Sequence, residues 1–166
     1  VNDGLVLGNV ALGGGANAFA NRAGGTFYSG TTLDLGDAAN LFTNDGLLAP
    51  GAANLALVTQ LGGSFRQGAG AQSVFELDFA SDTIDSLLAS GTATLDGAVD
   101  VSLLNVHRIR PGSHVKTLYS GAGGLTNEGL TLTAQPSIVI DYRLLTDATT
   151  AALGYEVDFS PDGLVG

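Results

Sequence analysis

The stretch Asn-Asp-Gly-Leu stands at residues 44–47, and close copies occur at residues 2–5 and, as Asn-Glu-Gly-Leu, at residues 127–130. Asn, Asp and Gly tolerate the backbone conformations of tight turns, and each copy leads into an apolar residue. A turn-then-strand phrase that returns along a chain indicates a repeated structural unit. It also makes an enzyme less expected, because stacked repeats form binding surfaces more often than active sites.

Short apolar segments separated by Gly, Asn and Asp run through the whole chain, as at residues 26–28, 41–43, 73–79 and 99–104. Such segments are typical of β-strands, whereas Gly and Asn interrupt nearly every window that would support a long helix. The best helical candidate is residues 81–89, where a strand or a turn is an equally good interpretation. The sequence therefore predicts an all-β fold.

The spacing of the repeats selects among the all-β architectures. Phe19 and Phe42 stand at equivalent places in two successive copies, because each precedes an Asn by the same short step, at Asn21 and Asn44. A period of about 20–25 residues fits one turn of a parallel β-helix, a solenoid in which the turn Asn side chains would form a hydrogen-bonded ladder. Its core would be a stack that includes Phe19, Phe27, Phe42, Leu33 and Leu35. A β-sandwich, which also has short and evenly spaced strands, remains the structural alternative.

The C-terminal residues follow another pattern. Apolar and polar side chains alternate over residues 138–145 and again over residues 153–159. Two alternating runs joined by a short link predict an antiparallel hairpin, in which we expect Arg143 opposite Glu156. The hairpin, residues 136–160, would cap the open end of the predicted stack, where apolar side chains and strand edges would otherwise be exposed.

The composition excludes several classes of function. The chain has 166 residues, enough for one domain with a buried core, and it has no Cys, which excludes disulfides and thiolate metal sites. Six basic residues stand against 16 acidic ones, so the formal net charge is −10. Such a surface repels phosphate backbones and anionic membranes, and we therefore expect no nucleic-acid partner.

The middle of the chain carries phrases with a family resemblance. Residues 63–67 read Gly-Ser-Phe-Arg-Gln, an acidic segment follows at 76–78, and residues 90–97 read Ser-Gly-Thr-Ala-Thr-Leu-Asp-Gly. This series, with Thr-Leu-Tyr-Ser-Gly-Ala-Gly-Gly-Leu at 117–125, resembles the passenger regions of bacterial autotransporters, the type V secretion proteins, just upstream of their outer-membrane barrel.

The resemblance implies a right-handed parallel β-helix exported to the cell surface or the medium by a Gram-negative bacterium. It further implies that the C-terminal part folds first and serves as a template for the rest. Residues 1–166 would be a single passenger fragment, with helical turns over 1–135 and the hairpin cap over 136–160. Residues 161–166 resemble the approach to the linker, and we expect the barrel to lie outside this sequence.

Few residues suggest chemistry. His107 and His114 share a polar stretch with Arg108 and Arg110, but their spacing of seven fits no zinc signature. With Lys116, this stretch holds half of the basic residues, and it is interpreted either as a solvated loop or as a contact point for an acidic partner.

Three acidic residues, Asp78, Asp82 and Asp85, are close in sequence, yet they match no calcium-loop pattern. We therefore predict no catalytic, cofactor-binding or metal-binding residues, and no cofactor.

These observations predict a non-enzymatic structural module of an autotransporter passenger that serves as stalk, folding template and possible adhesive surface. Its expected partners are the barrel of its own parent chain, further copies of itself, or a host or cell-surface molecule. A self-assembling extracellular fibre or layer is the main alternative. A β-helical carbohydrate-active enzyme is a minor one, and it would need two or three carboxylates converging on a groove lined with aromatic residues.

Overall fold

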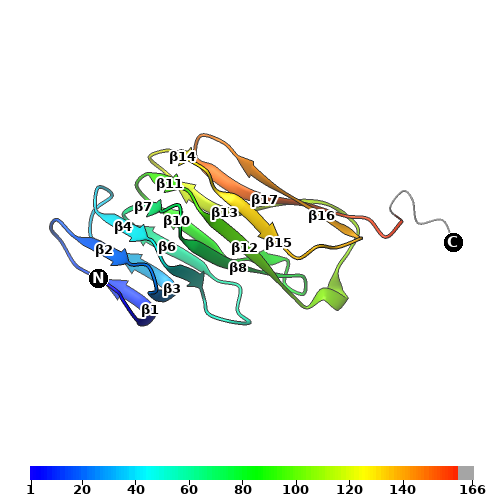
Figure 1. Ribbon diagram of the computed structural model, residues 1–166, viewed down its shortest axis with the longest axis horizontal. Coiled ribbons are helices and arrows are strands. Elements are labelled where there is room, and N and C mark those ends of the chain that lie inside the picture. The colour runs from blue at the N-terminus through cyan, green and yellow to red at the C-terminus, as the bar shows by residue number, and fades with distance from the viewer. Residues whose placement is uncertain (161–166) are drawn as a thin grey trace.

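The computed structural model describes residues 1–160 and shows an elongated molecule built from β-strands (Figure 1). The N-terminal strands lie at one end of its long axis and the C-terminal hairpin lies towards the other. The prediction of an all-β fold is confirmed. Within the described residues the helical structure is a single 3-10 turn, η1 (Val106–Arg108), and no helix is long and apolar enough to cross a membrane.

The smaller of the two sheets has five parallel strands in the order β14-β11-β7-β4-β2. Phe19 lies opposite Phe42 and Phe42 opposite Phe65, so one constant sequence offset relates the first three strands. The offset then widens between Phe65 and Ala93 and again between Ala93 and Leu125, because the loops grow longer. The strands are β2 (Ala18–Asn21), β4 (Leu41–Asn44), β7 (Ser64–Gln67), β11 (Ala93–Leu95) and β14 (Leu125–Asn127).

The larger sheet has 12 strands, ten of which follow the order β15-β12-β8-β5-β3-β6-β10-β13-β17-β16, while β1 pairs with β3 and β9 pairs with β8. Most of these pairs are parallel, and the antiparallel ones involve β9, β16 and β17. The strands are β1 (Leu5–Ala11), β3 (Thr26–Asp34), β5 (Leu47–Pro50), β6 (Val58–Gly62), β8 (Gln72–Asp78), β9 (Thr83–Ile84), β10 (Ser86–Ala89), β12 (Ala98–Leu104), β13 (Gly112–Gly121), β15 (Thr131–Ala134), β16 (Ile140–Thr146) and β17 (Thr150–Val157).

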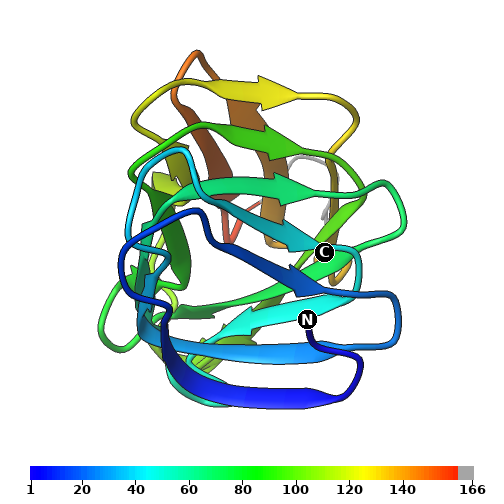
Figure 2. The same ribbon diagram turned by 90° about the vertical axis from the view of Figure 1, so that its left-hand side faces the viewer.

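This topology makes the prediction of a right-handed parallel β-helix, a solenoid with a hairpin cap, wrong. A solenoid keeps equivalent strands of successive repeats in separate stacks. Here the long strand β3 pairs with β5 through its first half and with β6 through its second half, so two stacks merge into one sheet. That sheet mixes parallel and antiparallel pairs and curves round the core into a nearly closed, barrel-like wall (Figure 2). Because most pairs are parallel, the antiparallel sandwich does not describe the fold either.

The recurring Asn side chains line up inside the smaller sheet. Asn2 donates from Nδ2 to Oδ1 of Asn21 at 2.8 Å, and Asn21 donates in the same way to Asn44 at 2.8 Å. Asn44 then donates to Oε1 of Gln67 at 3.4 Å. We call these four buried side chains the amide row. The prediction that turn Asn residues hydrogen-bond to one another is thus confirmed for Asn2, Asn21 and Asn44.

The glycine of the repeated phrase is required by the close stacking of successive turns. A Cβ atom at Gly46 would collide with the backbone carbonyl oxygens of Gly25 and Arg22 in the preceding turn. Close stacking of the turns therefore requires a residue without a side chain at this position.

The third copy of the phrase lies outside the amide row. Asn127 is exposed, and its Oδ1 accepts hydrogen bonds from the backbone N–H groups of Gly129 and Leu130. Its neighbour in the sheet is the fully buried Leu95, which has no amide to offer. The interior polar row therefore ends before β11, although the turn phrase returns later in the sequence.

Aromatic rings form a second row beside the amides. Phe19, Phe42 and Phe65 follow one another with ring centroids 5.4 Å and 5.2 Å apart, and Phe65 stacks on Tyr119 at 5.8 Å. Each ring is buried and fills the space between the two sheets. The predicted core is confirmed, because its five residues are all buried: Phe19, Phe27, Phe42, Leu33 and Leu35.

The predicted C-terminal hairpin forms, but in a different register. Strands β16 and β17 are antiparallel, with Arg143 opposite Gly154 rather than Glu156. The shift arises because Asp147 closes the turn quickly: its Oδ1 accepts the backbone N–H groups of Thr149 and Thr150, both at 2.8 Å. Strand β17 therefore begins at Thr150, inside the segment expected as a link. It lies between β16 and β13 and pairs with both.

Residues 81–89, the best helical candidate, form strands β9 and β10 instead. Ile84 and Leu87 are buried, and β10 lies between β6 and β13 in the larger sheet. Pairing on both sides overrides the weak helical preference of this segment. The expected linker approach, residues 161–166, lies outside the described residues.

Candidate functional site: a basic pocket beside the 3-10 turn

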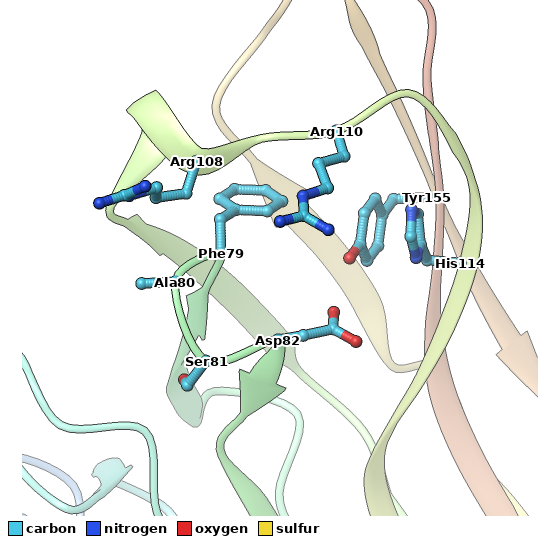
Figure 3. A pocket seen from close by; sticks show the side chains of 8 residues that line it. All are labelled: Phe79, Ala80, Ser81, Asp82, Arg108, Arg110, His114 and Tyr155. Carbon is cyan, nitrogen blue, oxygen red and sulfur yellow. The ribbon is translucent and has the colours of Figure 1, made fainter.

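A pocket of about 270 Å³ lies where four segments of the chain meet (Figure 3). The turn after β8 supplies residues 79–82, and the loop around η1 supplies Arg108 and Arg110. Strand β13 adds His114, and β17 adds Tyr155. The basic stretch identified in the sequence therefore forms one wall of a concave site.

Aromatic side chains build the rigid part of this pocket. The Tyr155 ring is buried, with His114 stacked on it at a centroid distance of 4.7 Å and an interplanar angle of 14°. The Phe79 ring contacts the Tyr155 ring edge-on, with a centroid distance of 6.0 Å. Figure 3 shows the guanidinium group of Arg110 directed from the η1 loop into the pocket. The guanidinium group of Arg108 lies on the far side of Phe79.

The opposite wall carries an acid. The Asp82 carboxylate lies below Arg110 and faces Tyr155 in Figure 3. Lys116 binds it with an Nζ to Oδ1 distance of 2.8 Å, and also donates to the Asp82 carbonyl oxygen at 2.8 Å. Burial, followed by the negative charge of Asp82, raises the pKa of Tyr155 to about 12. Tyr155 is therefore a neutral hydroxyl at physiological pH.

The turn that presents Asp82 is held by Asp78. The Asp78 carboxylate accepts hydrogen bonds from Nδ2 of Asn105 at 2.6 Å and from the hydroxyl of Ser81 at 2.7 Å. These bonds, with one from the backbone of Ala80, lower the pKa of Asp78 to about 2. A charged Asp78 thus ties the β8–β9 turn to the residue that begins the η1 loop.

Two buried carboxylates anchor a different loop. Glu76 accepts the backbone N–H groups of Asn54 at 2.8 Å and Leu55 at 2.7 Å. Asp85 accepts those of Leu57 and of Glu76 itself. Burial raises the pKa of Asp85 to about 7, against the lowering effect of these hydrogen bonds. The pair therefore fixes the loop between β5 and β6, and both residues also line a pocket of about 210 Å³ beside that loop.

The residues considered from the sequence are brought together only in part, since Asp82, Arg108, Arg110 and His114 line the pocket and the others lie outside it. His107 lies on η1 and is exposed, whereas His114 stacks on Tyr155. Of the three acids considered for calcium, Asp78 binds Asn105, Asp82 binds Lys116, and Asp85 binds the backbone. Over residues 1–160 no three His, Asp or Glu side chains gather in a way that would hold a metal ion.

Sequence reasoning named the basic residues of the pocket and Asp82 but missed its aromatic residues. Phe79 and Tyr155 lie in opposite halves of the sequence, and each resembles an ordinary strand residue there. Only the pairing of β17 with β13 brings Tyr155 to the η1 loop. No protein-family model matches this chain, and the search of curated proteins finds no significant match.

Proposed function

We propose that this chain is a non-enzymatic structural module of an exported protein, the C-terminal part of an autotransporter passenger at the surface of a Gram-negative bacterium. Its role would be that of a stalk and folding template, with the outer-membrane barrel of the parent chain as its first partner. Its outer surface would be available for adhesion. The support for this family comes from the sequence phrases at residues 63–67 and 90–97. It does not include a β-helical fold.

The observation that carries the proposal is the open strand edge at the N-terminal end of the molecule. There β1 pairs only with β3 among the described strands, so its other edge has unpaired backbone groups. At the C-terminal end β17 is paired on both sides, while β16 pairs only with β17. A template needs an edge to which another strand can add, and β1 supplies one on the side of the preceding chain.

The polar interior also supports a structural role. The amide row donates to neighbouring side chains and backbone carbonyls, and Glu76 and Asp85 accept backbone N–H groups. These buried polar groups connect one segment of the chain to the next. Fully satisfied groups of this kind fix a unique packing.

Pulsed hydrogen exchange during refolding of the whole chain tests the template role. We expect amides of β13, β16 and β17 to become protected before those of β1 to β3, because the C-terminal strands would form the surface on which the others pair. Simultaneous protection, or earlier protection of β1 to β3, would contradict the role.

Self-association is a second candidate, favoured by the composition of β1. This edge strand holds no charged residue, and Leu5 and Leu7 are 60% and 63% exposed. An apolar edge of this kind is a template for pairing with another chain. We expect a larger species at high concentration in size-exclusion chromatography with light scattering, and its loss in Leu7→Lys. A monomer at every concentration would dismiss this candidate.

A further inference from the structure

We propose that the pocket between the β8–β9 turn, the η1 loop, β13 and β17 binds a small carboxylate that also carries a hydroxyl or amino group. Arg110 would bind the carboxylate. The Asp82 carboxylate and the Tyr155 hydroxyl would bind the hydroxyl or amino group. This inference does not depend on the proposed structural role.

The charge distribution favours an anion at this place. The whole chain carries a formal charge of −10, yet three of its six basic residues, Arg108, Arg110 and Lys116, lie at or beside the pocket. Within residues 1–160 the ion pairs are Arg22–Asp3 and Lys116–Asp82. The two arginines are therefore without a carboxylate partner in the part of the chain that the structure describes.

Arg110 is directed into the pocket. Figure 3 shows its guanidinium group extending from the η1 loop towards the space in front of Tyr155, whose ring is stacked on His114. Arginine is the residue best suited to a carboxylate, since its planar fork donates two parallel hydrogen bonds.

The far wall calls for a donor on the same ligand. The Tyr155 side chain is 1% exposed, and within residues 1–160 its hydroxyl has no hydrogen-bond partner and faces the pocket. The Asp82 carboxylate, one oxygen of which binds Lys116, faces the same space. A ligand hydroxyl or ammonium group would satisfy both acceptors.

The size of the pocket limits the ligand. Its volume of about 270 Å³ lies just below the ~300–1,000 Å³ of ordinary small-molecule sites. Arg110 and Asp82 face the same space without forming an ion pair, which leaves room for a ligand between them. A molecule of a few non-hydrogen atoms, such as a hydroxy acid or an amino acid, fits these limits.

Titrations followed by the amide ¹H–¹⁵N spectrum of the whole chain test the inference. The probes are lactate, glycine, acetate and glycerol. We expect lactate or glycine to shift amides of residues 79–82 and 108–114 with dissociation constants in the millimolar range, which correspond to a few good hydrogen bonds. Acetate should bind at least about threefold more weakly, since it lacks the donor, and glycerol should cause no shift. A preference for lactate over glycine, or the reverse, identifies the donor as hydroxyl or ammonium.

Three variants complete the experiment. Arg110→Gln should weaken binding by roughly tenfold or more, because it removes a charge-assisted pair. Tyr155→Phe keeps the buried ring and should reduce the preference for lactate or glycine over acetate. Arg66→Gln, an exposed arginine on the smaller sheet, is the matched control and should bind like the wild type.

Three results would overturn the inference. One is an absence of shifts at the pocket with every probe, which would indicate that Arg110 serves only to hold the η1 loop. If acetate bound with the same affinity as lactate and glycine, Asp82 and Tyr155 would not recognise a donor on the ligand. If Arg110→Gln and Arg66→Gln weakened binding equally, Arg110 would not bind the carboxylate.

Discussion

The N-terminal and C-terminal parts of the core are held together in different ways. In the first three strands of the smaller sheet, like residues lie next to like: Phe beside Phe and amide beside amide, at a constant sequence offset. In the C-terminal part β13, β17 and β16 pair antiparallel with one another, and the interior holds Tyr119, Tyr155 and small alanines. A sequence repeat therefore marks the region where identical side chains stabilise one another, and it disappears where packing between unlike residues takes over.

The largest effect should come from the aromatic row. Phe42 contacts the rings of Phe19, Phe27 and Phe65, so Phe42→Ala should destabilise the fold by about 3–5 kcal/mol through lost burial and the cavity left behind. The measurement is chemical denaturation followed by circular dichroism. Phe159→Ala is the control, because Phe159 is 53% exposed and should cost less than about 1 kcal/mol. Equal losses would mean that the row is not the main support of the N-terminal part.

The amide row should give the next largest effect. Asn21 accepts from Asn2 and donates to Asn44 and to the carbonyl oxygen of Leu47, so Asn21→Ala removes three hydrogen bonds within the buried row. We expect a loss of about 2–4 kcal/mol in the same denaturation experiment. Asn127→Ala in the exposed copy of the phrase should cost about 1 kcal/mol or less. A reversed order would show that the buried row contributes less than the exposed turn.

The buried carboxylate between the two parts should give the fold a pH dependence. The pKa of Asp85 is raised from 3.8 to about 7 in the folded state, so the folded chain binds more protons than the unfolded one between these values. Stability should therefore rise as pH falls from about 7 towards 4, by an amount on the order of a few kcal/mol. Denaturation midpoints of the wild type and Asp85→Asn across this range measure it. The variant should lose this contribution, and an unchanged profile would contradict the assignment.

The smallest effect should be confined to the hairpin. Asp147 is exposed, and hydrogen bonds from Thr149 and Thr150 lower its pKa to about 2. Asp147→Ala should therefore loosen the turn and raise amide exchange in β16 and the start of β17, with little change in the melting temperature. Asp141→Ala, an exposed acid on β16, is the control. A global loss of stability in Asp147→Ala would show that the hairpin supports the whole core.

The sequence identified the local features correctly. The turn phrase predicted hydrogen-bonded Asn side chains, and the spacing of Phe19 and Phe42 predicted that the two rings lie next to each other. Both inferences rest on residues whose partners are identical residues one repeat away. When like residues pair in this way, the sequence period alone identifies both partners of the contact.

The architecture and the pocket were beyond such reasoning for a physical reason. The choice of β3 to pair with β5 in one half and β6 in the other depends on how the strand bends, which no spacing records. Likewise Phe79, Arg110 and Tyr155 line one pocket because three distant segments converge. The number of residues between paired positions also increases along the smaller sheet, so the later repeats have no constant sequence period.

The amide row also gives the molecule a direction. Each side-chain nitrogen in the row donates to the side-chain oxygen of the next residue, from Asn2 to Gln67. Gln67 in turn donates from Nε2 to the backbone carbonyl oxygens of Asp96 and Ala98. Aligned hydrogen bonds of this kind polarise one another, so the amide row has a defined polarity along its length. A strand added at β1 would extend it only by offering a nitrogen to Asn2. A second copy placed head to head would bring like atoms together, so any growth along this axis is restricted to one orientation.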